Sequence, residues 1–204
     1  MSSTKKAIRM MKQNLADWEK IKENLKKELQ TRGLRLSLAD LSGFVEELSP
    51  SWGQKALGFA LDFAKPFVAG IGLRVARWSD TSVEIIVPLK TKNKNESGTL
   101  HHGVLVTGAI ECVQLLWSRH LPLTYENWSL QNFHIDFLRP AEGDVFIRYE
   151  LLESEREKIL FQARVNQSVS IEAPIHLFDS NGQLIAEAKA SLSLQQRVAI
   201  PSQS

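Results

Sequence analysis

One short stretch of the chain places asparagine, glycine and histidine close together, directly before a long apolar segment. It reads Asn95-Glu96-Ser97-Gly98-Thr99-Leu100-His101-His102-Gly103. If a helix begins here, its first backbone N–H groups lack partners within the helix and lie at the positive end of its dipole. Gly103 has no side chain, so a ligand can approach its backbone closely. We therefore expect a site that suits a carbonyl oxygen as it gains negative charge during acyl transfer.

Hydrolysis at such a site also needs a base that positions or activates water. Glu111 lies two turns into the apolar segment and is the only carboxylate between residues 103 and 119. Since a buried carboxylate needs a compensating partner, Glu111 is interpreted either as a catalytic base or as half of an ion pair at a dimer seam. His101 is expected either to brace the loop by a hydrogen bond or to contact the substrate.

The elements around this stretch follow from the hydrophobic pattern. Residues 103–119 contain no proline and are apolar on nearly all sides, which predicts a buried helix. Strands are predicted before it, over residues 71–78 and 82–88, and after it, over residues 132–138, 143–152, 158–167, 170–178 and 184–197, with a hairpin turn at Asn181-Gly182. We expect an α+β fold in which an antiparallel sheet wraps around the central helix, and dimerisation would cover its exposed edge.

The first 65 residues are expected to be a helical N-terminal extension, with helices over residues 5–30, 38–48 and 52–64. Residues 1–33 hold nine basic and four acidic residues, a local charge of +5. Packing onto the same domain or onto a dimer partner is the simpler interpretation of the first helix. Membrane-surface contact by residues 5–30 is the alternative, and a nucleic-acid role is disfavoured by the interleaved acids. Residues 66–197 would form the main domain, and residues 198–204 a flexible tail.

Composition narrows the class of protein. The 204 residues carry a net charge of +2, so the overall charge favours no particular partner. Cys112 is the only cysteine, which excludes an intrachain disulfide and a zinc site built on thiolates, and it is interpreted as a small buried hydrophobe. His134 and His176 lie on predicted strands and are expected to be satisfied or to face solvent. With no secretory signal and no membrane span in the sequence, we expect a cytoplasmic protein without a metal site.

The loop and a second motif resemble a known superfamily. The pattern Asn95-x-x-Gly98-x-x-His101-x-Gly103 resembles the Asn-x-x-Gly-x-x-His-Gly-Gly signature of the phenylacetate-type and 4-hydroxybenzoyl-CoA-type hotdog thioesterases. The run Asp136-Phe137-Leu138-Arg139-Pro140-Ala141 is similar to the strand-end pattern of the same superfamily. The polar loop Asn93-Lys94-Asn95 most resembles the PaaI-like branch, which includes the YiiD C-terminal-type thioesterase-like domains. The resemblance covers roughly residues 66–197 and implies a hotdog fold and acyl-CoA thioesterase activity.

This resemblance implies a role for each matching position. His101 matches the loop histidine, Gly103 the glycine whose N–H would face the thioester oxygen, and Asn95 the asparagine that helps to brace the turn. Arg139 is interpreted as a contact for a CoA phosphate or as a surface or interface ion pair. The residues expected to act in catalysis are Glu111, His101 and Gly103. Those expected to bind substrate are Asn95, His102, Val104, Thr107, Gln114 and Arg139.

Two positions depart from the family pattern. His102 stands where the family has its first glycine, and it adds a side chain at a point of close approach. The family acid lies seven residues after the second glycine, which is Ile110 here, and Glu111 comes one residue later. A bulge in the first turn of the helix, or a shift of the motif by one residue, would bring Glu111 into place. Thr107 and Gln114 share the glycine face of the helix and could instead hold a water there.

We expect hydrolysis of acyl-CoA or related acyl thioesters at a site between two subunits, in a homodimer or a dimer of dimers. One subunit would give the helix start and the other the carboxylate. CoA would enter only as part of the substrate, and no metal or redox cofactor is implied. A non-catalytic acyl-CoA or lipid-binding module is the alternative, motivated by Ile110 at the acid position. A hydratase acting on enoyl thioesters is disfavoured, because the loop and the helix lack a suitable Asp.

Overall fold

The computed structural model describes Lys20, Glu23, Val68 and residues 70–121, 125–166 and 168–196, with the side chains of residues 125–128 and 196 excepted. Apart from Lys20 and Glu23, the helices predicted over residues 5–30, 38–48 and 52–64 lie outside these residues. The tail predicted over residues 198–204 lies outside them as well.

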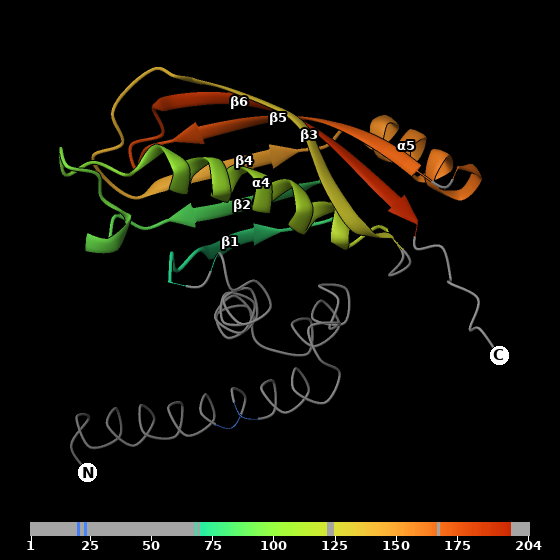
Figure 1. Ribbon diagram of the computed structural model, residues 1–204, viewed down its shortest axis with the longest axis horizontal. Coiled ribbons are helices and arrows are strands. Elements are labelled where there is room, and N and C mark those ends of the chain that lie inside the picture. Colours follow the sequence, from blue (N-terminus) through green and yellow to red (C-terminus); the bar gives the residue numbers. More distant parts are fainter. Residues whose placement is uncertain are drawn as a thin grey trace, which may run out of the picture. The chain divides into compact units, whose positions relative to one another are not determined.

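The described part of the chain forms a six-stranded antiparallel sheet with a long helix packed against it (Figure 1). In chain order the elements are β1 (Arg74–Trp78), β2 (Ser82–Val87), the 3-10 turn η2 (Thr91–Asn93), α4 (His102–Ser118), β3 (Tyr125–Phe137), β4 (Val145–Glu150), α5 (Glu153–Val165), β5 (Ser168–Phe178) and β6 (Leu184–Gln196). The strands lie in the order β1-β2-β4-β5-β6-β3, so β3 crosses to the far edge of the sheet. This is the predicted α+β layout, with one buried helix against an antiparallel sheet.

The strands are specified by the alternation of buried and exposed residues along the chain. On β5 every second residue is buried, and the residues between them are exposed. The buried row of β5 is Val169, Ile171, Ala173, Ile175 and Leu177. The hairpin that follows turns at Gly182, whose φ of +78° suits a glycine, and Oδ1 of Asp179 accepts hydrogen bonds from the backbone of Asn181 and Gln183, each at 2.8 Å. The hairpin predicted at Asn181-Gly182 is therefore confirmed.

Helix α4 packs on the face of the sheet formed by β2 and β4. A Cβ atom on Gly108 would lie 2.7 Å from Cδ1 of Ile147 and 2.9 Å from Cγ2 of Val87, so the absence of a side chain there allows the close approach. One turn later Sγ of Cys112 lies 3.6 Å from the Ile147 carbonyl, and this residue is fully buried, as predicted. Further along, Nε1 of Trp117 donates a hydrogen bond to the Tyr149 hydroxyl at 3.1 Å. The predicted buried central helix is confirmed.

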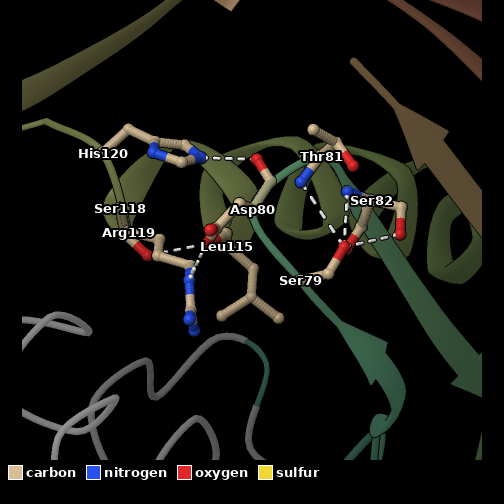
Figure 2. A network of polar contacts seen from close by, with 8 residues as sticks. All are labelled: Ser79, Asp80, Thr81, Ser82, Leu115, Ser118, Arg119 and His120. Atoms are coloured by element: carbon tan, nitrogen blue, oxygen red, sulfur yellow. Dashed lines mark hydrogen bonds and ion pairs between the residues drawn. The ribbon is translucent and has the colours of Figure 1, made fainter. Parts of the chain in front are cut away.

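A polar network fixes the C-terminal end of α4 to the turn between β1 and β2 (Figure 2). Nε of Arg119 lies 2.7 Å from a carboxylate oxygen of Asp80, and Nε2 of His120 lies 2.6 Å from the Asp80 carbonyl oxygen. Within the turn, the Ser79 hydroxyl lies 2.8 Å from that of Ser82. Because cations are favourable near a helix C-terminus, this network suits the helix end it holds.

One predicted element is wrong. Residues 158–167 were expected to form a strand, but Glu153–Val165 is the helix α5. The apolar residues 159–161 are consecutive, which does not fit the two-residue period of a strand. Ile159 and Ala163 instead lie four residues apart on one face, and the first turn carries Glu153 and Glu155, as suits the positive end of a helix dipole. Strand β3 also begins at Tyr125, seven residues before its predicted start at residue 132.

Candidate active site

The loop before α4 is held by a buried asparagine that the sequence did not single out for this role. The Asn93 side chain is 2% exposed, and its amide donates to the carbonyl oxygens of Ile71 at 3.0 Å and Pro88 at 2.8 Å. The Asn93 carbonyl accepts the N–H of His101 at 2.8 Å. Asn93 therefore connects the segment before β1 and the residue after β2 to His101, which directly precedes α4. Its position in a polar loop, two residues before Asn95, was the available signal.

Asn95 braces the next turn, as predicted. Its Oδ1 accepts the N–H groups of Ser97 at 3.0 Å and Thr99 at 3.1 Å, and its Nδ2 donates to the Thr99 hydroxyl at 2.8 Å. Gly98 completes the turn with a φ of +81°, a conformation that L side chains rarely adopt. The polar atoms of the Asn95 side chain are thus engaged within the loop itself.

His101 is the N-cap of α4. Its backbone is extended, and its Nδ1 accepts the N–H of Gly103 at 3.0 Å. A Cβ on Gly103 would lie 3.1 Å from that Nδ1, so a side chain at residue 103 would crowd the His101 ring. Since Nδ1 accepts, the proton of a neutral imidazole lies on Nε2. The loop-bracing role expected as one of two alternatives for His101 is what the structure shows.

The other N–H groups of the first turn differ in their partners. The amides of Val104 and Leu105 donate to the His101 carbonyl at 3.0 Å and 3.4 Å. No partner for the amide of His102 is found within the part of the chain that the structure describes. The start of α4 therefore offers one open N–H group, at His102, and beside it one N–H group held by an exposed side chain, at Gly103.

His102 brings a ring to the same place. Its centroid lies 4.4 Å from that of Phe137, at an interplanar angle of 54°. Phe137 is the last residue of β3 and is 38% exposed, although it pairs with the fully buried Ala186 of β6. Because directly paired residues point to the same side of a sheet, Phe137 faces the side on which α4 lies. The sequence placed Phe137 within the strand-end run of residues 136–141 but assigned it no role in the site.

The predicted residues farther along α4 lie at increasing distances from the helix start. The Thr107 hydroxyl donates to the carbonyl oxygen of Gly103 at 2.8 Å, while Ile110 and Gln114 are half-buried. Glu111 is 9% exposed. Eight residues of α-helix separate Glu111 from Gly103, which is about 12 Å along the axis. Within one chain, therefore, the carboxylate and the Gly103 amide are too far apart to hold the same small group.

A cavity of about 460 Å³ lies beside the loop, at the same end of the sheet. The Leu100 N–H donates to the Ala141 carbonyl at 2.9 Å, which joins the loop before α4 to the segment that lines the cavity. Arg139 is exposed, and its Nη1 donates to Oε1 of Gln183 at 2.7 Å. The polar and charged side chains that line the cavity are Arg139, Glu142, Asp179, Ser180, Asn181 and Gln183.

The remaining titratable candidates lie apart from this site. His134 and His176 are exposed, as predicted, and Nε2 of His134 lies 3.1 Å from Asp136. Burial raises the pKa of the Cys112 thiol, so this residue is not a ready nucleophile. Across residues 70–121, 125–166 and 168–196, no three His, Cys, Asp or Glu side chains gather as metal ligands would. No helix in this part of the chain is long and apolar enough to cross a membrane.

Comparisons with known proteins agree with this architecture. Residues 53–194 match DUF4442, described as a domain of unknown function. A probable thioesterase from Pseudomonas aeruginosa has a similar structure, with a TM-score of 0.61 and 23% identity over 70% of this chain and 96% of that one. A thioesterase from Haemophilus influenzae has a TM-score of 0.55 and 17% identity over 70% and 90%. A protein of unknown function from Chlorobaculum tepidum has a TM-score of 0.61 and 14% identity over 74% and 98%.

A search of curated protein sequences finds no match. The structural likenesses confirm the predicted hotdog fold. At these identities they show the fold, and the chemistry has to be argued from the residues of this chain.

Proposed function

We propose that this chain, which belongs to the DUF4442 family, hydrolyses acyl thioesters such as acyl-CoA. The observation that carries the proposal is the start of α4, where the N–H of His102 is open and that of Gly103 is held only by the exposed imidazole of His101. On a hotdog fold this is the place where backbone donors can meet a ligand carbonyl.

The first step would be an exchange of hydrogen-bond acceptors. The thioester oxygen takes the place of Nδ1 of His101 on the Gly103 N–H, and the His102 N–H lies next to it. The helix fixes both backbone donors before the substrate arrives, so only the His101 ring has to move for them to stabilise the developing oxyanion. The displaced imidazole remains beside the acyl group and can orient it, which joins the two roles considered for His101.

The carboxylate would come from a second copy of the chain. Glu111 lies about 12 Å along the helix axis from Gly103 in its own chain, so it cannot serve that amide. The edge strand β3 supports such a dimer, because it is 13 residues long and, among the described strands, pairs only with β6. It also exposes 43% of Leu130 and 38% of Phe137. An unpaired edge with exposed apolar side chains is favourable for antiparallel pairing with its own copy about a two-fold axis.

In this arrangement Glu111 acts as the general base. Its carboxylate takes a proton from a water molecule as the water oxygen bonds to the thioester carbon. The carbon–sulfur bond then breaks, the leaving thiolate takes the proton from Glu111, and a carboxylic acid and a free thiol result. The chain supplies the base and the donors, and no further reactant is needed.

The acyl group and the carrier would occupy different surfaces. Val104 on α4, and Ile135 on the side of the sheet where α4 lies, have partly exposed apolar side chains, which suits an acyl chain. Arg139 and the cavity beside it suit the polar carrier, with the guanidinium available to a CoA phosphate. The attacking water would be held by Thr107 of the subunit that supplies the donors and by Gln114 of the subunit that supplies Glu111.

A non-catalytic acyl-binding module is the second candidate. It is favoured by one observation, the occupation of the Gly103 amide by His101, which leaves the donor engaged in the absence of a ligand. Such a protein would bind an acyl-CoA with an affinity measurable by calorimetry and release no thiol from it.

The test is the release of free CoA thiol from butyryl-, octanoyl- and palmitoyl-CoA by the full-length protein. We expect turnover of at least one of them and a fall in kcat of about 10²–10⁴-fold in Glu111→Gln, the range usual for loss of a general base. Glu187→Gln is the matched control, since Glu187 is exposed on the face of the sheet away from α4. No thiol release from any of the three, or an unchanged kcat in Glu111→Gln, would overturn the mechanism.

A further inference from the structure

We infer that His102 and Phe137 form a specificity wall that excludes acyl groups branched next to the carbonyl. This inference rests on the proposed function and names the class of substrate that the same site accepts. It begins from the ring pair at 4.4 Å, which joins the first residue of α4 to the last residue of β3.

The ring pair is not part of the buried core. His102 is exposed and Phe137 is 38% exposed, so both rings are reachable from solvent. Both nevertheless lie on backbone that is firmly held. The residue after Phe137 donates its N–H to the Ile185 carbonyl at 2.8 Å, and His102 begins a helix whose N-cap is held through the buried Asn93. An approaching ligand therefore meets two partly exposed rings whose backbone is held in place by hydrogen bonds.

The two N–H donors, of His102 and Gly103, have different surroundings. On the Gly103 side there is no side chain, and among the described residues the ring that a Cβ there would meet is that of His101, which the substrate oxygen would displace. On the His102 side, the imidazole of His102 packs against the ring of Phe137. His102 occupies a position where the resembling thioesterases have glycine, so this second flank is an addition in the present chain.

The consequence for substrates follows from bond lengths. The α-carbon of an acyl group is one bond from the carbonyl carbon, so it lies close to whatever flanks the carbonyl donors. A straight chain can turn away from the wall toward Ile135, whereas a methyl branch on the α-carbon directs a second group at the rings. Sites of this kind discriminate a single methyl group by about 10–200-fold in kcat/KM.

The experiment compares butyryl-CoA with isobutyryl-CoA, which have the same atoms and differ in the branch. In the wild-type protein we expect kcat/KM for butyryl-CoA to exceed that for isobutyryl-CoA by at least about tenfold. In both His102→Gly and Phe137→Ala we expect this ratio to fall at least about tenfold, mainly through faster turnover of the branched substrate. Two variants are used because either substitution alone could weaken the local fold.

Phe161→Ala is the matched control, because Phe161 is also an exposed phenylalanine but lies far from the site. Phe161 is on α5, which leads into the start of β5, whereas Phe137 lies beside the end of β5, at the opposite end of the sheet. It should leave the ratio unchanged. A ratio that stays within twofold of wild type in both wall variants overturns this inference and leaves the proposed function intact. Absence of turnover of any thioester by the wild-type protein overturns the proposed function, and this inference with it.

Discussion

The backbone N–H of Gly103 donates to Nδ1 of His101 at 3.0 Å, so the helix start is capped by a residue predicted either to brace the loop or to contact the substrate. The same contact explains the glycine, because a Cβ there would lie 3.1 Å from the ring nitrogen. The cap is therefore a structural interaction as well as a part of the site.

Loss of this cap should destabilise the fold in a graded way. We expect His101→Ala to lower the free energy of unfolding by about 0.5–2 kcal/mol, as N-cap removal usually does. His101→Asn should retain most of the stability, since asparagine is a good N-cap. Urea unfolding followed by circular dichroism measures both. Equal stability of His101→Ala and the wild type would mean that the hydrogen bond contributes nothing.

A second prediction concerns the contact between α4 and the sheet. Gly108→Ala adds a methyl group that would lie 2.7 Å from Cδ1 of Ile147, so it should destabilise the protein by about 1–3 kcal/mol through overpacking. Gly143→Ala is the control, because a Cβ at Gly143 meets nothing within 4 Å. Thermal unfolding of the two variants should separate them clearly. If they unfold together, α4 does not lie this close to β2 and β4.

The buried thiol gives a chemical test of the same packing. Cys112 is fully buried, and burial raises its pKa, so the reactive thiolate is scarce and inaccessible. We expect Ellman's reagent to find no fast-reacting thiol in the native protein and one in urea. Rapid labelling under native conditions would show that α4 separates from the sheet. The same measurement secures the CoA-release assay, since the enzyme itself would then contribute no thiol signal.

Stability should fall at alkaline pH because of Tyr149. Burial raises the pKa of its hydroxyl to about 12, above the value of about 10 that it has in an unfolded chain. Between these two values the folded state binds more protons than the unfolded state, so the free energy of unfolding falls as pH rises. The loss should reach about 2 kcal/mol at pH 12. Urea unfolding from pH 8 to 12 measures it.

Tyr149→Phe is the control for that decline. The variant should start about 1–3 kcal/mol less stable, because the buried Nε1 of Trp117 loses its acceptor at 3.1 Å. Its stability should then fall less steeply above pH 10, since the titrating group is gone. Parallel curves for the wild type and the variant would assign the alkaline loss to other groups.

The architecture was predictable because its signals are local. The apolar run after Gly103 predicted the buried helix, and the alternation of β5 and the Asn181-Gly182 turn predicted the hairpin. The strand expected over residues 158–167 was wrong because composition favoured a strand there while the spacing of Ile159 and Ala163 favours a helix. Period is the stronger signal where the two conflict.

The site was predictable only in part, because its contacts join residues far apart in the chain. The motif pointed to Asn95 and His101, and the structure shows that both brace the loop by hydrogen bonds. The contact of His102 with Phe137 spans 35 residues, and the burial of Asn93 depends on where β1 begins and β2 ends, so neither has a local signature. The separation of Glu111 from Gly103 follows from their spacing of eight residues on one helix, and it makes a second copy necessary for the mechanism.

The central claim is a site whose donors and whose base come from different subunits, and subunit complementation tests it most directly. Glu111→Gln and Gly103→Val should each be inactive toward acyl-CoA as pure, folded proteins. When the two are unfolded together and refolded as a mixture, half of the dimers pair one copy of each, and each mixed dimer holds one intact site. We predict recovery of about a quarter of wild-type turnover in the mixture. A mixture that stays as inactive as its parents, although mixed dimers form, would contradict the account.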